Sequence, residues 1–201
     1  MKPPTLIAIL AVAVHAHALT ASQPDPQDQL SQETEATATL ALFKRARQPS
    51  AQAIDAAARS WQRDTGVVSQ FLSTAESMSP QQLQQQARVA LSAENDELNH
   101  KKVLDQMFLT GARRNRDATV RQANNVLDTQ GTFQFVVDGL QTLSRRGARM
   151  SPGQVSSMIR AINRDRCPQV LPAIDAYMAA AAGAGGGQTG NALRAIRPSN
   201  C

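Results

Sequence analysis

The chain has few cysteines and few aromatic residues, and each shortage excludes a class of protein. Two cysteines among 201 residues cannot build a disulfide-dense scaffold or a four-cysteine zinc site. Five Phe, one Trp and one Tyr are too few for an all-β sandwich, a base-stacking platform or an aromatic strip that binds sugars. The chain does have 42% hydrophobic residues and a formal net charge of +5, so it can build a core and is not wholly disordered.

Residues 1–18 have the pattern of a secretory signal peptide. Lys2 supplies a positive start, residues 6–14 form an unbroken apolar run, and Ala16-His17-Ala18 offers the small-x-small pattern that signal peptidase reads. This run is too short to span a bilayer, and a stretch of about twenty apolar residues occurs nowhere else, so we expect no transmembrane segment. We therefore expect a secreted, extracellular protein that is cleaved after Ala18.

Residues 19–45 are interpreted as a propeptide or disordered leader. The segment is polar and acidic, lacks periodicity, and ends in Lys44-Arg45, a dibasic pair of the kind that kexin-type secretory proteases cut. An ordinary basic pair at the start of a helix is the alternative. The pair lies where aperiodic sequence gives way to periodic sequence, which favours processing and a mature chain that begins at Ala46.

Residues 46–182 are predicted to form an all-α domain, a single compact bundle of about five or six helices with flexible termini. Apolar residues recur at three- and four-residue steps from Ile54 to Ala75 and from Leu83 to Phe108. Ser79-Pro80 and Ser151-Pro152 are helix-start signals. The expected helices lie within residues 49–75, 79–111, 114–127, 131–147, 151–168 and 170–182.

Residues 183–201 form a glycine-rich tail that ends in the second cysteine. For an exported chain with two cysteines, we expect a disulfide between Cys167 and Cys201 that ties this tail back. An intermolecular bridge through Cys201 and two free thiols are the alternatives. The intrachain bond would close a loop of about 35 residues.

The sequence around Cys167 predicts a corner between two helices. Pro168 is expected to end one helix and Pro172 to begin the next, because proline lacks the N–H of a helix interior. Asn163 and Asp175 are expected to satisfy backbone donors at this corner. Cys167 would then be free to reach the tail.

Glu94, Glu97 and His100 form the densest candidate for chemistry. Glu97 and His100 have the three-residue spacing of a helical carboxylate–imidazole metal pair, and Glu94 falls on the same face. Once the signal peptide is removed, His100 is the only histidine, so a second pair for a di-iron site cannot be built. We therefore interpret these residues as a solvated helix face in which Glu97 pairs with Lys101, and expect no metal, no cofactor and no enzymatic activity. A secreted hydrolase or metal-dependent enzyme that uses Glu94, Glu97 and His100 is the alternative.

Arginines gather in short clusters that are candidates for a surface that binds an anionic partner. Such a surface could contact phosphates, anionic lipids or acidic wall polymers, whereas solvated helix ends are the ordinary alternative. Nucleic acid is not expected, because the chain carries a signal peptide and its basic clusters lack interleaved aromatic residues. The cluster residues are Arg113, Arg114 and Arg116, then Arg145, Arg146 and Arg149, and then Arg160, Arg164 and Arg166.

Residues 162–175, INRDRCPQVLPAID, resemble an Ile-Asn-x-x-Arg-Cys-x-x-Val-Leu-Pro-x-x-Asp signature of small secreted fungal proteins of uncharacterised function. The first helix, with Trp61 and the stretch from Val67 to Ala75, looks like the opening of the same group. A looser likeness is to secreted fungal proteins that bind hydrophobic surfaces. The group brings no catalytic residues to this chain.

Export, a compact helical body, one disulfide and the lack of an assembled active site predict a secreted, non-enzymatic binding protein that acts through its helical surface, and the resemblance implies its role. Its partner would be an extracellular or host protein or a cell-wall polymer, and its role that of a fungal effector, a virulence factor or a wall-associated protein. An amphipathic coat that binds hydrophobic interfaces is a further alternative.

Overall fold

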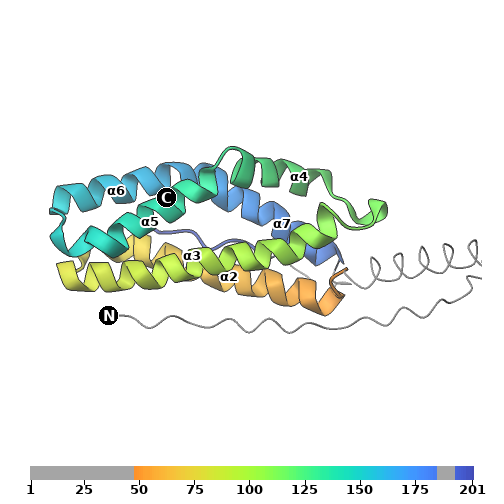
Figure 1. Cartoon of the computed structure of the whole chain (residues 1–201), viewed down its shortest axis with the longest axis horizontal. Coiled ribbons are helices and arrows are strands. Elements are labelled where there is room, and N and C mark those ends of the chain that lie inside the picture. The colour runs from red at the N-terminus through yellow and green to blue at the C-terminus, as the bar shows by residue number, and fades with distance from the viewer. Residues whose placement is uncertain (1–47, 185–192) are drawn as a thin grey trace, which may run out of the picture. The chain divides into compact units, whose positions relative to one another are not determined.

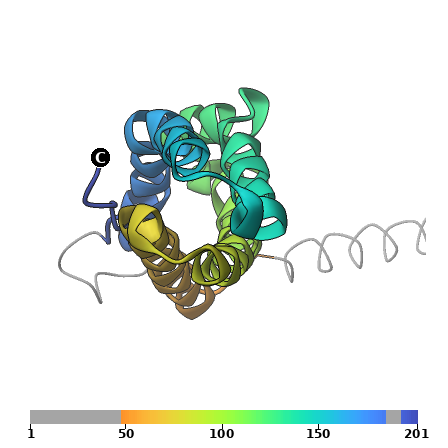
Figure 2. The same ribbon diagram turned by 90° about the vertical axis from the view of Figure 1, so that its left-hand side faces the viewer.

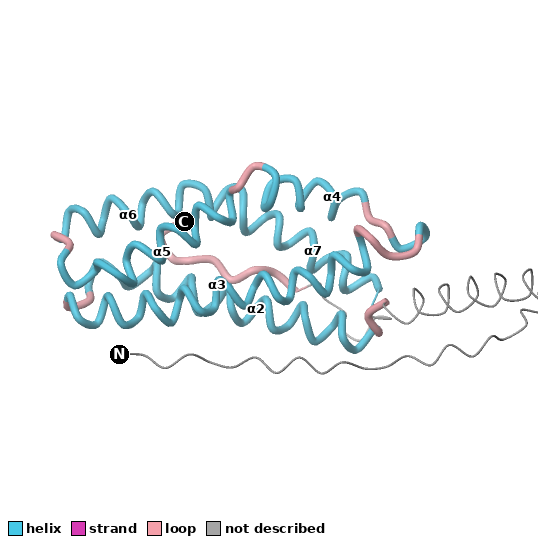
Figure 3. The backbone as a smooth tube through the Cα atoms, viewed as in Figure 1, coloured by secondary structure: helices cyan, strands magenta, loops and turns pink. Residues whose placement is uncertain are grey.

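The computed structural model describes residues 48–184 and 193–201. The expected signal peptide and leader, with Ala18, Lys44 and Arg45, lie outside the described residues, as do residues 185–192 of the tail. The described residues form helices and connecting loops without a strand (Figure 3). The all-α prediction is therefore confirmed.

The helices form a bundle in which successive long segments run in opposite directions (Figure 1). α2 packs along α3, α3 along α5, and α7 contacts both α2 and α4. The view along the bundle axis shows the helices side by side around a common core (Figure 2). Their bounds are α2 (Ala51–Thr74), α3 (Pro80–Phe108), α4 (Ala118–Asn124), α5 (Thr132–Arg146), α6 (Pro152–Asp165) and α7 (Leu171–Ala184).

Three serine caps start the long helices. The Ser50 side chain accepts a hydrogen bond from Ala53 N, and that of Ser79 accepts one from Gln82 N. Ser151 forms a complete capping box, because Gln154 also accepts a hydrogen bond from the Ser151 backbone N–H. The predicted starts at Ser79-Pro80 and Ser151-Pro152 are confirmed.

Two π-turns divide the second half of the bundle. Residues Asn125–Thr129 join α4 to α5, and residues Arg166–Val170 join α6 to α7, and the two turns are in contact. The expectation that Pro168 ends its helix at a sharp corner is wrong, because the helical path continues through the second turn. The wider turn accommodates a residue that has no N–H to donate.

The third expected helix begins later than predicted. Arg113–Asn115 form a short 3₁₀ turn, and α4 begins at Ala118 after Asp117, whose side chain accepts hydrogen bonds from Thr119 N and Val120 N. Asp117 is a better cap than any residue near Arg114, because its carboxylate satisfies two free helix donors.

The C-terminal strap, residues 193–201, lies along α2 and α7 and ends in the predicted disulfide. Cys167 and Cys201 are bonded, with Cα atoms 5.6 Å apart. Asn163 and Asp175 do not serve the expected corner. Asn163 donates to Asn200 Oδ1, and Asp175 accepts from Ala195 N, so both hold the strap. Within the described ranges, no helix is both long enough and apolar enough to cross a membrane.

Candidate functional site

Three charged residues interrupt the buried face of α3. Glu94 and Glu97 have no exposed surface, and Lys101 is 3% exposed. They follow Ala90 and precede Leu104 at alternating four- and three-residue steps, so they lie in register with the apolar stripe. The interpretation of this stretch as a solvated face is therefore wrong. The sequence did carry a signal of this burial, namely the spacing of the three residues, because charged residues that continue an apolar stripe face the core.

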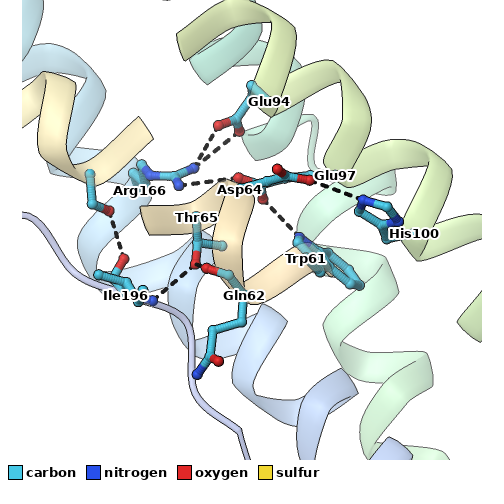
Figure 4. Close-up of polar contacts among 10 residues, drawn as sticks. Trp61, Gln62, Asp64, Thr65, Glu94, Glu97, His100, Arg166 and Ile196 are labelled. Carbon is cyan, nitrogen blue, oxygen red and sulfur yellow. Dashed lines mark hydrogen bonds and ion pairs between the residues drawn. The ribbon is translucent and has the colours of Figure 1, made fainter. Parts of the chain in front are cut away.

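Arg166 is the partner of both glutamates. Its Nη1 lies 3.1 Å and 2.8 Å from the two carboxylate oxygens of Glu94, and its Nη2 lies 3.4 Å from Glu97 Oε1. Arg166 has no exposed surface, so it does not belong to the basic surface where the sequence placed it. The π-turn that begins at Arg166 directs its guanidinium between α2 and α3 (Figure 4).

Trp61 of α2 completes this cluster. Its Nε1 donates a hydrogen bond of 2.8 Å to Glu97 Oε2, and its ring lies 5.2 Å from that of Tyr177, centroid to centroid. Side chains of α2, α3, the second π-turn and α7 therefore meet at one level of the bundle. We call Trp61, Glu94, Glu97 and Arg166 the buried ion cluster.

The buried ion cluster carries two carboxylates and a single cation. Burial, and then the charge of Glu94, raise the pKa of Glu97 well above its usual range, while Arg166 and Trp61 oppose this rise. Burial also raises the pKa of Glu94, against the attraction of Arg166. Burial alone would lower the pKa of Arg166, but the two carboxylates outweigh it and raise that pKa. Burial and the neighbouring carboxylate therefore favour the neutral form of Glu97 more than that of Glu94, and Glu94 is the more closely paired partner of Arg166.

Lys101 is satisfied separately, one turn further along α3. Its Nζ donates to Asp105 Oδ2 at 2.7 Å and to Asp128 Oδ2 at 2.8 Å, and also to Asn124 Oδ1. The three ammonium donors therefore have three acceptors. Tyr177 Oη donates to the other oxygen of Asp105 at 2.6 Å, and burial followed by this bond raises the pKa of Tyr177. The expected pairing of Lys101 with Glu97 is wrong.

His100 is not joined to the two glutamates. Its Nε2 lies 3.0 Å from Asp64 Oδ2 of α2. Burial raises the pKa of Asp64, although the attraction of His100 opposes this. Within the described part of the chain, no three His, Cys, Asp or Glu side chains are placed to hold a metal ion. The carboxylates proposed as ligands instead bind Arg166 and fasten the helices together.

An open groove of about 990 Å³ lies between the end of α5 and the start of α6. Arg146 and Arg149 line it together with Met150 and Met158, so cationic groups stand beside apolar ones. Its full lining is Thr142, Arg146, Arg149, Met150, Ser151, Gly153, Gln154, Ser157, Met158 and Ala161. We call this the arginine groove.

The first two of the three predicted arginine clusters lie at opposite ends of the bundle, as the segments that carry them show (Figure 1). Gln84, near the start of α3, donates to Arg145 O, whereas the connection that carries Arg113, Arg114 and Arg116 follows the end of α3 at Phe108. The helix between Gln84 and Phe108 is about 36 Å long. The clusters therefore cannot form one continuous surface, and the arginine groove contains residues of only the second.

Comparison of the chain with protein-family models, with curated proteins and with solved structures finds no match.

Proposed function

We propose that the chain is a secreted, non-enzymatic binding protein that recognises an acidic peptide segment of an extracellular protein through the arginine groove. The resemblance to small secreted fungal proteins supports the class, and an effector or wall-associated role follows from that resemblance. An intrachain disulfide suits an oxidising compartment.

The observation that carries the proposal is the composition of the arginine groove. Arg146 and Arg149 supply positive charge, and Met150 and Met158 supply adaptable apolar contacts. No acidic residue lines the groove, so an incoming carboxylate meets no repulsion there. A segment that alternates acidic and apolar side chains would satisfy both kinds of contact.

The charged residues of the buried ion cluster pair with one another, which favours a function carried by surface residues. Glu94, Glu97 and Arg166 bond to one another without exposed surface, and none of them lines the arginine groove. Arg146 and Arg149 of the groove, by contrast, are exposed and can contact a partner.

A pair of double variants tests the proposal. Arg146→Gln with Arg149→Gln should weaken binding of an acidic, apolar-anchored peptide about tenfold, a loss of roughly 1.4 kcal/mol. Arg113→Gln with Arg114→Gln removes equal charge from the opposite end and should leave the affinity within about twofold. An acidic polysaccharide serves as the second ligand. Equal losses in both variants, or tighter binding of the polysaccharide than of the peptide, would contradict the proposal.

A further inference from the structure

The disulfide lies on the wall of a second open cavity, of about 400 Å³. Cys201 is exposed and Cys167 is partly buried, so Cys201 is the more accessible residue of the pair. The lining residues are Glu76, Arg160, Asn163, Arg164, Cys167, Asn200 and Cys201. Exposed disulfides are the ones that exchange most readily with thiols.

Two cationic side chains line this cavity. Arg160 and Arg164, both exposed, lie in its lining together with one acidic side chain, that of Glu76. Ser156 Oγ donates a hydrogen bond to Glu76 at 2.8 Å and accepts one from Arg160. Ser156 therefore fixes the positions of both the Glu76 carboxylate and the Arg160 guanidinium. A cationic setting attracts an anionic thiol and stabilises the thiolate that leaves when the disulfide opens.

The C-terminal strap is held beside Cys167 by contacts that do not depend on the disulfide. From α2, Thr65 Oγ1 accepts from Ile196 N at 3.0 Å, Ser69 Oγ donates to Ile196 O at 2.6 Å, and Ser73 Oγ accepts from Ser199 N at 2.9 Å (Figure 4 shows the contacts of Ile196). These three hydroxyls are four residues apart along α2 and therefore share one face.

The other side of the strap is held as firmly. Asp175 accepts from Ala195 N at 2.7 Å and pairs with Arg197 at 2.7 Å. Asn200 accepts from Asn163 of α6 at 2.9 Å, and it also donates to Leu72 O of α2 at 3.1 Å. Reduction of the disulfide does not break these hydrogen bonds or the ion pair. Since they hold the strap along its length, Cys201 stays next to Cys167 after the disulfide opens.

We propose that this cavity is a thiol–disulfide exchange site for small thiols that carry carboxylate groups. The incoming thiolate attacks Sγ of Cys201, the sulfur–sulfur bond breaks, and its electron pair leaves on Sγ of Cys167. Cys201 then carries the mixed disulfide. A second thiol of the same class attacks the thiol-derived sulfur of that mixed disulfide and releases the oxidised small disulfide with the Cys201 thiolate. The two protein sulfurs take up the two protons that the thiols lost, so the protein is reduced by two electrons and two thiols are oxidised.

This reaction is separate from the proposed peptide binding, because the arginine groove shares no residue with the disulfide cavity. The strap contacts make the reaction reversible, since the reduced cysteines stay adjacent and can be reoxidised without refolding. Arg160 and Arg164 set the preference for anionic thiols.

The test compares mercaptopropionate, mercaptoethanol and cysteamine, which carry a negative, a neutral and a positive group beside the thiol. The rate at which each thiol opens the disulfide is divided by the fraction of that thiol present as thiolate, because the thiolate is the attacking species. Mass spectrometry after an acid quench then shows which cysteine carries the adduct. The anionic thiol should react fastest and the cationic one slowest, with the first adduct on Cys201. Arg160→Gln with Arg164→Gln should slow the anionic thiol about three- to tenfold, and Glu76→Gln should quicken it.

Arg113→Gln with Arg114→Gln is the matched control, because these residues line neither cavity, and its rates should equal those of the wild-type protein. The proposal is overturned if the rate does not depend on the charge of the thiol, if the two double variants slow the reaction equally, or if the first adduct forms on Cys167. It is also overturned if the disulfide opens only at the rate of global unfolding, measured in parallel by circular dichroism.

Discussion

Nη1 of Arg166 lies 2.8 Å from Oε2 of Glu94, and neither side chain has any exposed surface. Arg166 reaches both oxygens of Glu94 but only one oxygen of Glu97, at 3.4 Å. Arg166 therefore binds Glu94 more closely than it binds Glu97, and substitutions of the two glutamates should have different effects on stability.

Glu94→Gln should destabilise the protein more than Glu97→Gln. The first change leaves a buried guanidinium without its charged partner, which costs about 3 to 5 kcal/mol of the free energy of unfolding. The second replaces the carboxyl whose pKa is raised further, and which Arg166 contacts through one oxygen only, with a neutral group of similar shape, at a cost of about 1 kcal/mol. Chemical denaturation at neutral pH measures both. An equal or larger loss for Glu97→Gln would show that Glu97 carries the charge.

The stability contributed by Glu97 should fall as pH rises. Its pKa is raised in the folded protein, so between about pH 4.5 and that raised pKa the folded state retains a proton that the unfolded state loses. The contribution is complete below about pH 4.5 and decreases above it. The free energy of unfolding of the wild-type protein minus that of Glu97→Gln should therefore decline from pH 4.5 to pH 8. A difference that grows with pH would contradict the assignment of the proton.

Gly139→Ala should destabilise the bundle although alanine favours helices. A Cβ at this position would lie 2.7 Å from Cγ1 and 2.8 Å from Cδ1 of Ile162, whose side chain is fully buried. The resulting shift between α5 and α6 costs about 1 to 3 kcal/mol. Gly153→Ala is the control, because nothing lies within 4 Å of its Cβ position and the change should stabilise α6 by about 0.5 to 1 kcal/mol. Thermal unfolding of the two variants should shift in opposite directions.

Removal of both cysteines should weaken the protein without releasing the strap. Cys167→Ala with Cys201→Ala should lower the free energy of unfolding by roughly 3 to 4 kcal/mol, because the unfolded chain loses a closed loop. The amides of Ala195 and Ile196 should stay protected from hydrogen exchange, since Asp175 and Thr65 still accept their hydrogen bonds. Loss of that protection under native conditions would show that the disulfide alone holds the strap.

Expression in a eukaryotic secretory host should give a trimmed and oxidised chain. The intact mass should correspond to a protein that begins at Ala46 and is about two daltons lighter than its reduced form, for the two hydrogen atoms lost in the disulfide. Lys44→Gln with Arg45→Gln should leave a longer chain that begins at Leu19. A wild-type chain that stays inside the cell at full length would contradict both the export and the processing.

Features that depend on residues close together along the chain, such as helix caps, could be predicted from the sequence. Ser151 and Gln154 form their capping box from a spacing visible in the chain. The disulfide could also be predicted, because two cysteines allow one intrachain pairing.

The buried ion cluster could not be predicted in full, because its members meet only in the folded bundle. Arg166 lies 72 residues from Glu94 and 69 from Glu97 along the chain. It continues the apolar stripe of Ile159 and Ile162 at a four-residue step, which indicates burial but names no partner. The register of Glu94, Glu97 and Lys101 with the apolar stripe indicates burial, but it does not identify the partners. The π-turn at Arg166 depends on contacts between segments, and the helix-breaking preference of Pro168 pointed instead to a corner.

The bond between Cys201 and Cys167 determines where mechanical tension travels if the C-terminal residue is anchored. A pull at Cys201 passes through the sulfur bridge into the π-turn and bypasses α7. The next residue to bear the load is Arg166, whose grip on Glu94 lies at the centre of the bundle. Traction on this end is therefore resisted by the interior of the molecule, through the disulfide, as well as by the hydrogen bonds of the strap.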